Sequence, residues 1–228
     1  LLVPQVVVSA GTSHRPWLDR LRVAIRRSRD AAAEVIEEMG RPAPGADLAG
    51  LLHRAAQAKA YDAYHSSSIE GYRLSLDDVS VLLGGGAGGG RDIEDVRSKL
   101  AVIGYGIAFD RLLRRIGDAG GEVPLTNELA LDLYTDLFAP SIEAGLIPAN
   151  DLRGWRAGPV FIRDTLYVPP GAAKVPAMLD LMFEELGEVG YAQGVLRGIL
   201  VHLWFVWVHP VPDGSGRTAR FLMNTAFL

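Results

Sequence analysis

Apolar positions recur every three to four residues over most of the chain, and this spacing predicts helices. The expected helices cover residues 17–39, 47–69, 77–83, 93–116, 126–138 and 195–208, with others after Pro176 and from Phe221 to Leu228. The sequence contains no internal repeat.

The ends of several of these helices carry recognisable signals. Asp47 and Thr126 are suited to N-cap positions, and Gly71 is suited to the position just past a helix C-terminus. Pro140 is expected to end the helix that begins after Thr126, because proline has no N–H to donate.

Strand character is clear in one place only. Two apolar triplets, separated by Arg163-Asp164-Thr165 and followed by Pro169-Pro170, predict a small β-hairpin. The six side chains of the triplets are Val160, Phe161, Ile162, Leu166, Tyr167 and Val168. The expected fold class is therefore all-α, mostly helical, with one small β-hairpin.

Composition narrows the function. The 228 residues are 49% hydrophobic, carry a formal net charge of −4 and include no cysteine. The lack of cysteine excludes disulfides, thiol nucleophiles and cysteine-based metal sites. The negative net charge argues against a nucleic-acid binder. Only three of the 23 basic residues are lysines. The composition of the genome explains such a bias for most of them, and anion binding could explain particular arginines.

Membrane and targeting signals are weak. The longest apolar run, 198–208, is about half of the ~18 residues that a membrane span needs. The opening segment contains Pro4 and lacks a basic start, so it is a poor signal peptide. A soluble protein in the cytoplasm is expected.

Residues 84–90 read GGGAGGG, which satisfies the spelling of a dinucleotide-binding loop. A helix-like segment precedes it instead of a strand, so a flexible linker is the better interpretation. The predicted organisation is an N-terminal helical region over 1–90 that includes this linker, and a core over 91–228.

The most informative residues lie between 209 and 220. Gly214, Ser215 and Gly216 form a tight turn before a helix, where backbone N–H groups and the helix dipole favour a bound anion such as phosphate. Arg217 and Arg220, three residues apart, offer two guanidinium forks to the same anion.

Two further side chains complete this arrangement. Asp213 is a hard oxygen ligand suited to Mg²⁺ beside a phosphate. His209 can accept a proton near neutrality. A base, a metal ligand and an anion site at this spacing indicate phosphoryl or nucleotidyl transfer to a hydroxyl.

These residues resemble the motif of the Fic family, H-x-F-x-[D/E]-G-N-G-R-x-x-R, whose members mostly transfer AMP from ATP to protein hydroxyls. Val211 replaces the motif's Phe and Ser215 replaces its Asn. The Asn position is implied to help hold the α-phosphate, so Ser215 puts full activity in doubt. Val211 is interpreted as a change in packing.

A second match lies about 140 residues earlier. Ser66 and Glu70-Gly71 fit the family's inhibitory pattern [S/T]-x-x-x-E-[G/N], in which the Glu pairs with the second arginine of the motif. Here that pair would be Glu70 on Arg220, and the carboxylate would occupy the fork meant for the γ-phosphate. Ser66 and Glu70 are four residues apart and so share one helix face.

The resemblance implies a mostly helical Fic-like fold with the hairpin as a target-docking flap. It implies ATP and Mg²⁺ as substrate and cofactor, His209 as catalytic base, and a protein with an exposed hydroxyl as partner. Neither nucleic acid nor membrane is expected, and a homodimer is left open. The family core usually continues further, so the core here is expected to be truncated at its C-terminal end.

Other interpretations stay open from sequence. The domain could be a nucleotide-binding or protein-docking module with weakened catalysis, or a Fic enzyme that uses another nucleotide or removes AMP. Glu70 could be an ordinary surface carboxylate, and Asp213 a turn or cap residue. His202 is read as a buried histidine rather than half of a two-histidine metal site.

Overall fold

The computed structural model describes residues 15–39, 47–86, 93–162 and 165–228. Within them all regular structure is helical. The elements are α1 (Pro16–Met39), α2 (Leu48–Ile69), α3 (Leu76–Leu83), α4 (Ile93–Asp118), α5 (Asn127–Glu143), η1 (Ala149–Leu152), η2 (Ala172–Lys174), α6 (Val175–Gly187), η3 (Tyr191–Gln193), α7 (Gly194–Val208) and α8 (Ser215–Phe227).

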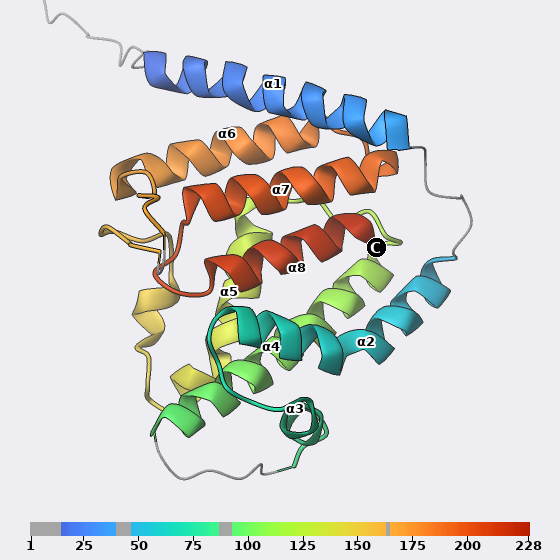
Figure 1. The fold of residues 1–228 in the computed structure, drawn as a ribbon, viewed down its shortest axis with the longest axis vertical. Coiled ribbons are helices and arrows are strands. Elements are labelled where there is room, and N and C mark those ends of the chain that lie inside the picture. Colours follow the sequence, from blue (N-terminus) through green and yellow to red (C-terminus); the bar gives the residue numbers. More distant parts are fainter. Residues whose placement is uncertain (1–14, 40–46, 87–92, 163–164) are drawn as a thin grey trace, which may run out of the picture.

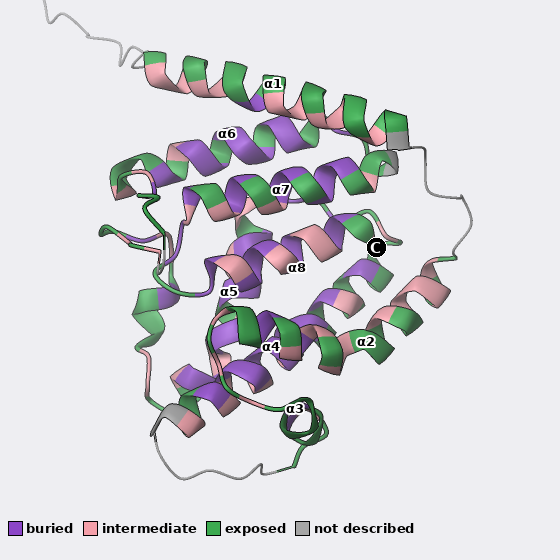
Figure 2. Cartoon of the chain, viewed as in Figure 1, coloured by how far each residue is buried: buried purple, intermediate pink, exposed green. Residues whose placement is uncertain are grey.

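The helices α1, α6, α7 and α8 lie one after another, and α5, α4 and α2 follow on the far side of α8 (Figure 1). The helix α7 is the most apolar of them. α1 crosses α6 and α7, α8 packs along α7, and α4 packs against both α5 and α2. Buried residues lie on the facing sides of these helices, as Figure 2 shows, and those of α7 include Leu200, Val201 and Phe205. The loop between α7 and α8, which carries the motif, is thus anchored by two core helices.

One buried carboxylate fixes α1 to the rest of the fold. Glu185 of α6 is fully buried and pairs with Arg22 at 2.8 Å and Arg26 at 2.9 Å, with Arg29 at 3.5 Å. A buried charge needs such partners, because leaving it unpaired costs several kcal/mol. Part of the arginine excess therefore has a structural role.

Helix ends mostly follow the predicted signals. The Asp47 and Thr126 side chains accept hydrogen bonds from the backbone N–H groups of Gly50 and Leu129, as N-caps do. The prediction that Pro140 ends its helix is wrong, because α5 continues through it to Glu143. Pro140 is buried within α5, where tertiary packing surrounds it.

The predicted β-hairpin is also wrong. The described parts of 160–168 contain no strand, and residues 163–164, its expected turn, lie outside the described residues. Phe161, Leu166 and Val168 are 79%, 101% and 66% exposed, so they lack the neighbours against which β-prone side chains pack. Two isolated strands gain little stability without such packing.

The boundary predicted at the Gly-rich run is only partly visible. Gly84 to Gly86 follow α3, and the rest of the run lies outside the described residues. The opening segment of the chain, a poor signal peptide by its sequence, lies outside them as well. The division into 1–90 and 91–228 stays a prediction. Helices from both parts pack together, since α1 contacts α6 and α2 contacts α4.

Candidate functional site

The site begins where α7 ends. His209 caps α7 with backbone angles φ 50 and ψ 62, and it is the one residue other than glycine with positive φ among those described. Its Nδ1 is buried and has no hydrogen-bond partner in the described structure. Burial lowers the pKa of His209 below 6.5, and the nearby Arg156 guanidinium acts in the same direction.

Backbone contacts hold the turn between α7 and α8. Gly214 takes a left-handed conformation (φ 85), which glycine adopts without strain, and its carbonyl accepts the N–H of Thr218. The buried Ser215 hydroxyl donates to Val211 O at 3.2 Å and accepts from Val211 N at 3.4 Å. Ser215 therefore braces the turn from inside, and Val211 is a fully buried packing residue as interpreted.

Arg217 is fully buried between two aromatic rings. Its guanidinium carbon lies 5.2 Å from the centre of the Tyr72 ring and 5.1 Å from that of Phe138, in cation–π geometry. Its Nη2 pairs with the largely exposed Asp213 at 3.1 Å. Nε and Nη1 are buried and have no hydrogen-bond partner within the described residues.

Arg220 receives its partners from α2 and its C-cap, and one of them is Glu70, as the resemblance implied. Its Nη2 donates to Glu70 Oε1 at 2.8 Å and to the Ser66 carbonyl at 3.1 Å. Its Nε donates to Ser66 Oγ at 2.9 Å. A Cβ at Gly216 would lie 2.5 Å from Glu70 Oε1, which places the carboxylate directly over the first turn of α8.

A buried relay extends this contact into the core. Tyr105 OH donates to Asp62 Oδ2 at 2.6 Å, so its oxygen accepts the Ser66 hydroxyl at 3.0 Å. Burial and the neighbouring Asp62 raise the pKa of Tyr105 far above its usual value, which keeps the phenol protonated. Sequence reasoning missed Asp62 and Tyr105, although Asp62, Ser66 and Glu70 follow at intervals of four residues on one face of α2.

The predicted flap lies beside the end of α7. Tyr167 OH donates to the carbonyl of Trp207 at 2.8 Å. Both ends of the segment meet the side chain of Arg156, which also contacts the backbone of His209. Sequence reasoning missed Arg156, and no sequence signal distinguished it from the other arginines.

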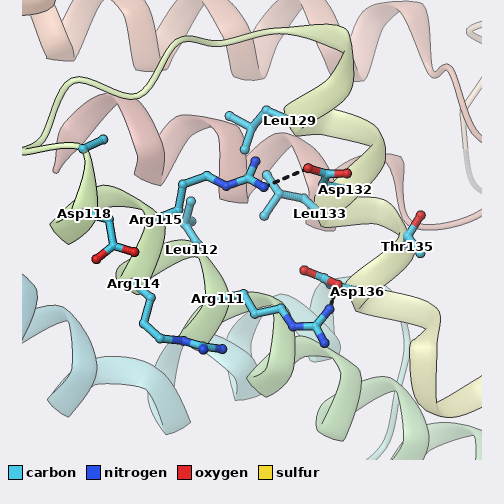
Figure 3. Close-up of a pocket in the computed structure, with 11 residues that line it drawn as sticks. Arg111, Leu112, Arg114, Arg115, Asp118, Leu129, Asp132, Leu133, Thr135 and Asp136 are labelled. Atoms are coloured by element: carbon cyan, nitrogen blue, oxygen red, sulfur yellow. Dashed lines mark hydrogen bonds and ion pairs between the residues drawn. The ribbon is translucent and has the colours of Figure 1, made fainter.

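Two cavities in the described part of the structure are candidates for a binding site. One of about 470 Å³ is lined by Glu70 and Asp213 together with Tyr72 and Phe138, and so opens onto the motif loop. Another of about 740 Å³ lies between α4 and α5, where Figure 3 shows Arg115 beside Asp132 and Arg111 beside Asp136. That second cavity contains none of the predicted site residues, and those four charges already pair.

Remaining expectations concern metals and membranes. The described residues contain no group of three or more His, Asp or Glu side chains placed to hold a metal ion. His202 is half-buried, and burial lowers its pKa. Among the described helices none is long and apolar enough to cross a bilayer.

Comparison with known proteins agrees with the motif. Residues 124–227 match the model of the Fic/DOC family. The protein adenylyltransferase Fic of Drosophila willistoni is 27% identical over 217 residues, which are 92% of this chain and 39% of that protein. A probable protein adenylyltransferase of Aquifex aeolicus is 31% identical over 75 residues, 33% of this chain and 23% of that protein.

Solved structures show the same fold. A Fic family protein from Desulfovibrio desulfuricans superposes with a TM-score of 0.60 at 17% identity, over 90% of this chain and 57% of that one. Fic-1 of C. elegans superposes with a TM-score of 0.52 at 21% identity, over 93% and 58%. The chain spans about two fifths of the Drosophila relative's length. The motif, held between two packed helices, lies within the residues that match the Fic/DOC family, and the family model, the relatives and the solved structures together support a Fic family protein.

Proposed function

We propose that this chain transfers AMP from ATP to a Ser, Thr or Tyr hydroxyl of a protein, and that Glu70 inhibits the transfer in cis. The observation that carries the proposal is the Glu70 carboxylate, 2.8 Å from Arg220 and close above Gly216. An anion already occupies the place where the α8 N-terminus and its arginine would bind phosphate. The relatives named as protein adenylyltransferases support the reaction type.

Phosphate binding would use groups that are preorganised. The first-turn N–H groups of α8 and the two unpartnered donors of Arg217 would hold the phosphates nearest the reaction, together with the backbone of Gly214, Ser215 and Gly216. Arg220 would bind the γ-phosphate once Glu70 withdraws. The inhibited and nucleotide-bound states therefore compete for one guanidinium.

His209 would act as the general base. Its lowered pKa keeps the imidazole neutral at pH 7, the form that accepts a proton. As the target oxygen forms its bond to the α-phosphorus, His209 would take the hydroxyl proton, and the bond to the pyrophosphate oxygen would break. Pyrophosphate leaves with the electron pair of that bond.

Asp213 fits a magnesium ion that arrives with ATP. Mg²⁺ typically takes one or two carboxylates and completes its coordination with phosphate oxygens and water, so a single exposed carboxylate is sufficient. When bound, the ion would neutralise phosphate charge. Asp213 would then leave or share its pairing with Arg217.

The exposed segment 160–168, called the docking segment below, would bind the target protein. Phe161, Leu166 and Val168 present apolar surface beside the end of α7. Val160, Ile162 and Tyr167 complete the proposed docking segment, and Tyr167 anchors it to Trp207. The cytoplasmic location stays a prediction from the sequence, and the homodimer stays open.

Ser215 is the observation that favours a second candidate, a weakened nucleotide-binding or protein-docking module. Its hydroxyl is occupied by the Val211 backbone, so it offers no side-chain donor to the α-phosphate. The two candidates separate in one experiment. The Glu70→Gly variant is incubated with Mg²⁺ and ATP, GTP, CTP or UTP in turn, and intact mass is recorded.

A mass gain of one adenylyl group with ATP supports the proposal, and a gain of another nucleotidyl group identifies a different donor. Tight binding of ATP with no gain on the chain or on added protein hydroxyls supports the weakened module. Release of AMP from a pre-modified protein identifies the reverse activity.

A further inference from the structure

Arg156 is a buried arginine that touches three separate stretches of backbone. It is 5% exposed and follows η1, before the docking segment. Nη1 donates to the carbonyl of Gly158 at 2.9 Å, and Nη2 donates to the carbonyl of Pro170. One guanidinium thus links Gly158 and Pro170, the residues that flank the docking segment on either side. In a β-hairpin, hydrogen bonds between the two strands would have made this link.

The same guanidinium contacts the base-bearing turn. Nε donates to the carbonyl of His209 at 2.7 Å, and Nη2 reaches that of Val208 at 3.4 Å. The backbone N–H of Arg156 donates to the carbonyl of Pro210 at 2.8 Å. These contacts surround a histidine whose left-handed backbone is unfavourable for a residue with a side chain, and they help to hold it there.

The charge of Arg156 is balanced by carbonyls. The described residues place no carboxylate in an ion pair with it, and burial lowers the pKa of its guanidinium. The carbonyls of Val208 and His209 are the last of α7, where the helix dipole places negative partial charge. A cation is stabilised at these carbonyls, and a guanidinium suits them because it carries a positive charge and several donors in one plane.

We propose that Arg156 is a positioning residue that couples the docking segment to His209, so that the target hydroxyl and the base are held in one frame. The inference rests on the proposed function for its catalytic consequence, because only transfer to a docked hydroxyl needs this alignment. Within the described residues the hydrogen bonds of Arg156 all go to backbone carbonyls, and none goes to Glu70, so nucleotide binding is not expected to depend on it directly.

The test uses the uninhibited Glu70→Gly chain with three added substitutions. Arg156→Gln removes charge and fork, Arg156→Lys keeps charge but loses the fork, and exposed Arg153→Gln is the matched control. Self-modification with Mg²⁺ and ATP is followed by intact mass, ATP binding by calorimetry, and the His209 imidazole by NMR titration.

We expect both Arg156 variants to slow self-modification by ~10- to 100-fold, the size of effect that a misplaced reacting group produces. ATP affinity should change by less than about two-fold, within the ordinary spread for a residue outside the site. Arg156→Gln should raise the pKa of His209 toward 6.5, because a nearby cation and part of the burial are lost, while Arg156→Lys should shift it less. Glu70 and Asp213 also act on His209, and Asp213 is unchanged throughout.

Each outcome decides the matter. A self-modification rate and His209 pKa equal to those of the Arg153→Gln control would overturn the proposal, as would rate loss explained by an equal loss of ATP affinity. If Arg156→Gln does not fold, the folded Arg156→Lys variant decides by its rate. If the Glu70→Gly parent itself transfers nothing, the proposed function fails, and the His209 titration alone still tests whether Arg156 positions the imidazole.

Discussion

Replacement of Glu70 by Gly should increase the affinity for Mg²⁺–ATP, because it removes the anion that now occupies the α8 site. The Glu70 and Arg220 side chains are 23% and 15% exposed and meet at 2.8 Å. Opposite charges about 4 Å apart at an effective dielectric of 20 attract by about 4 kcal/mol before desolvation is counted. A hydrogen bond between charged groups contributes a net of about 1.5–3 kcal/mol.

ATP must displace this contact to use Arg220. Its loss therefore predicts affinity gains of roughly 10- to 150-fold, since 1.4 kcal/mol corresponds to a factor of ten. Calorimetric titration of wild type and variant with Mg²⁺–ATP measures the ratio. Glu37→Gln, which removes an exposed carboxylate on α1, is the control and should leave the affinity unchanged.

A ratio near one for Glu70→Gly would refute the reasoning, because the carboxylate would then not compete with nucleotide. Glu70→Gln adds a further check. The amide keeps the shape and loses the charge, so its affinity should lie between those of wild type and Glu70→Gly.

Three further results are expected. His209→Ala in the Glu70→Gly chain should reduce transfer by ~10²- to 10⁴-fold in an intact-mass time course, with ATP affinity within two-fold of the parent by calorimetry; an unreduced rate would exclude His209 as the base. The rate of Glu70→Gly should rise with pH and level off near neutrality, because burial lowers the pKa of the His209 imidazole, whose neutral form is the active base; a rate that still rises steeply well above pH 7, measured over a series of pH values, would contradict this. Tyr105→Phe should lower the free energy of unfolding by about 1–3 kcal/mol in urea titration, because the buried Ser66 hydroxyl loses its acceptor and Asp62 its donor; an unchanged value would show that the relay adds no stability.

Much of the architecture could be predicted because helices are encoded locally. The spacing of apolar residues and the caps at Asp47 and Thr126 depend on near neighbours in sequence. The two errors depend on tertiary context. Pro140 continues its helix within buried surroundings, and the strand-prone residues 160–168 have no partner surface on which to form a hairpin.

The candidate site shows the same division. The residues from His209 to Arg220 are contiguous, so their spacing was visible, and the contact of Glu70 with Arg220 followed from the resemblance. Arg156, Tyr72 and Phe138 reach the site only through folding. Nothing in the local sequence around them specifies a guanidinium on carbonyls or rings on Arg217.

The central claim is that this fold transfers AMP and that Glu70 restrains it. The most direct measurement is the intact mass of wild type, Glu70→Gly and Glu70→Gly with His209→Ala after incubation with Mg²⁺–ATP. The account predicts an added adenylyl mass on Glu70→Gly, little on wild type and none on the double variant. Equal modification of wild type and Glu70→Gly, or modification that persists without His209, would contradict it.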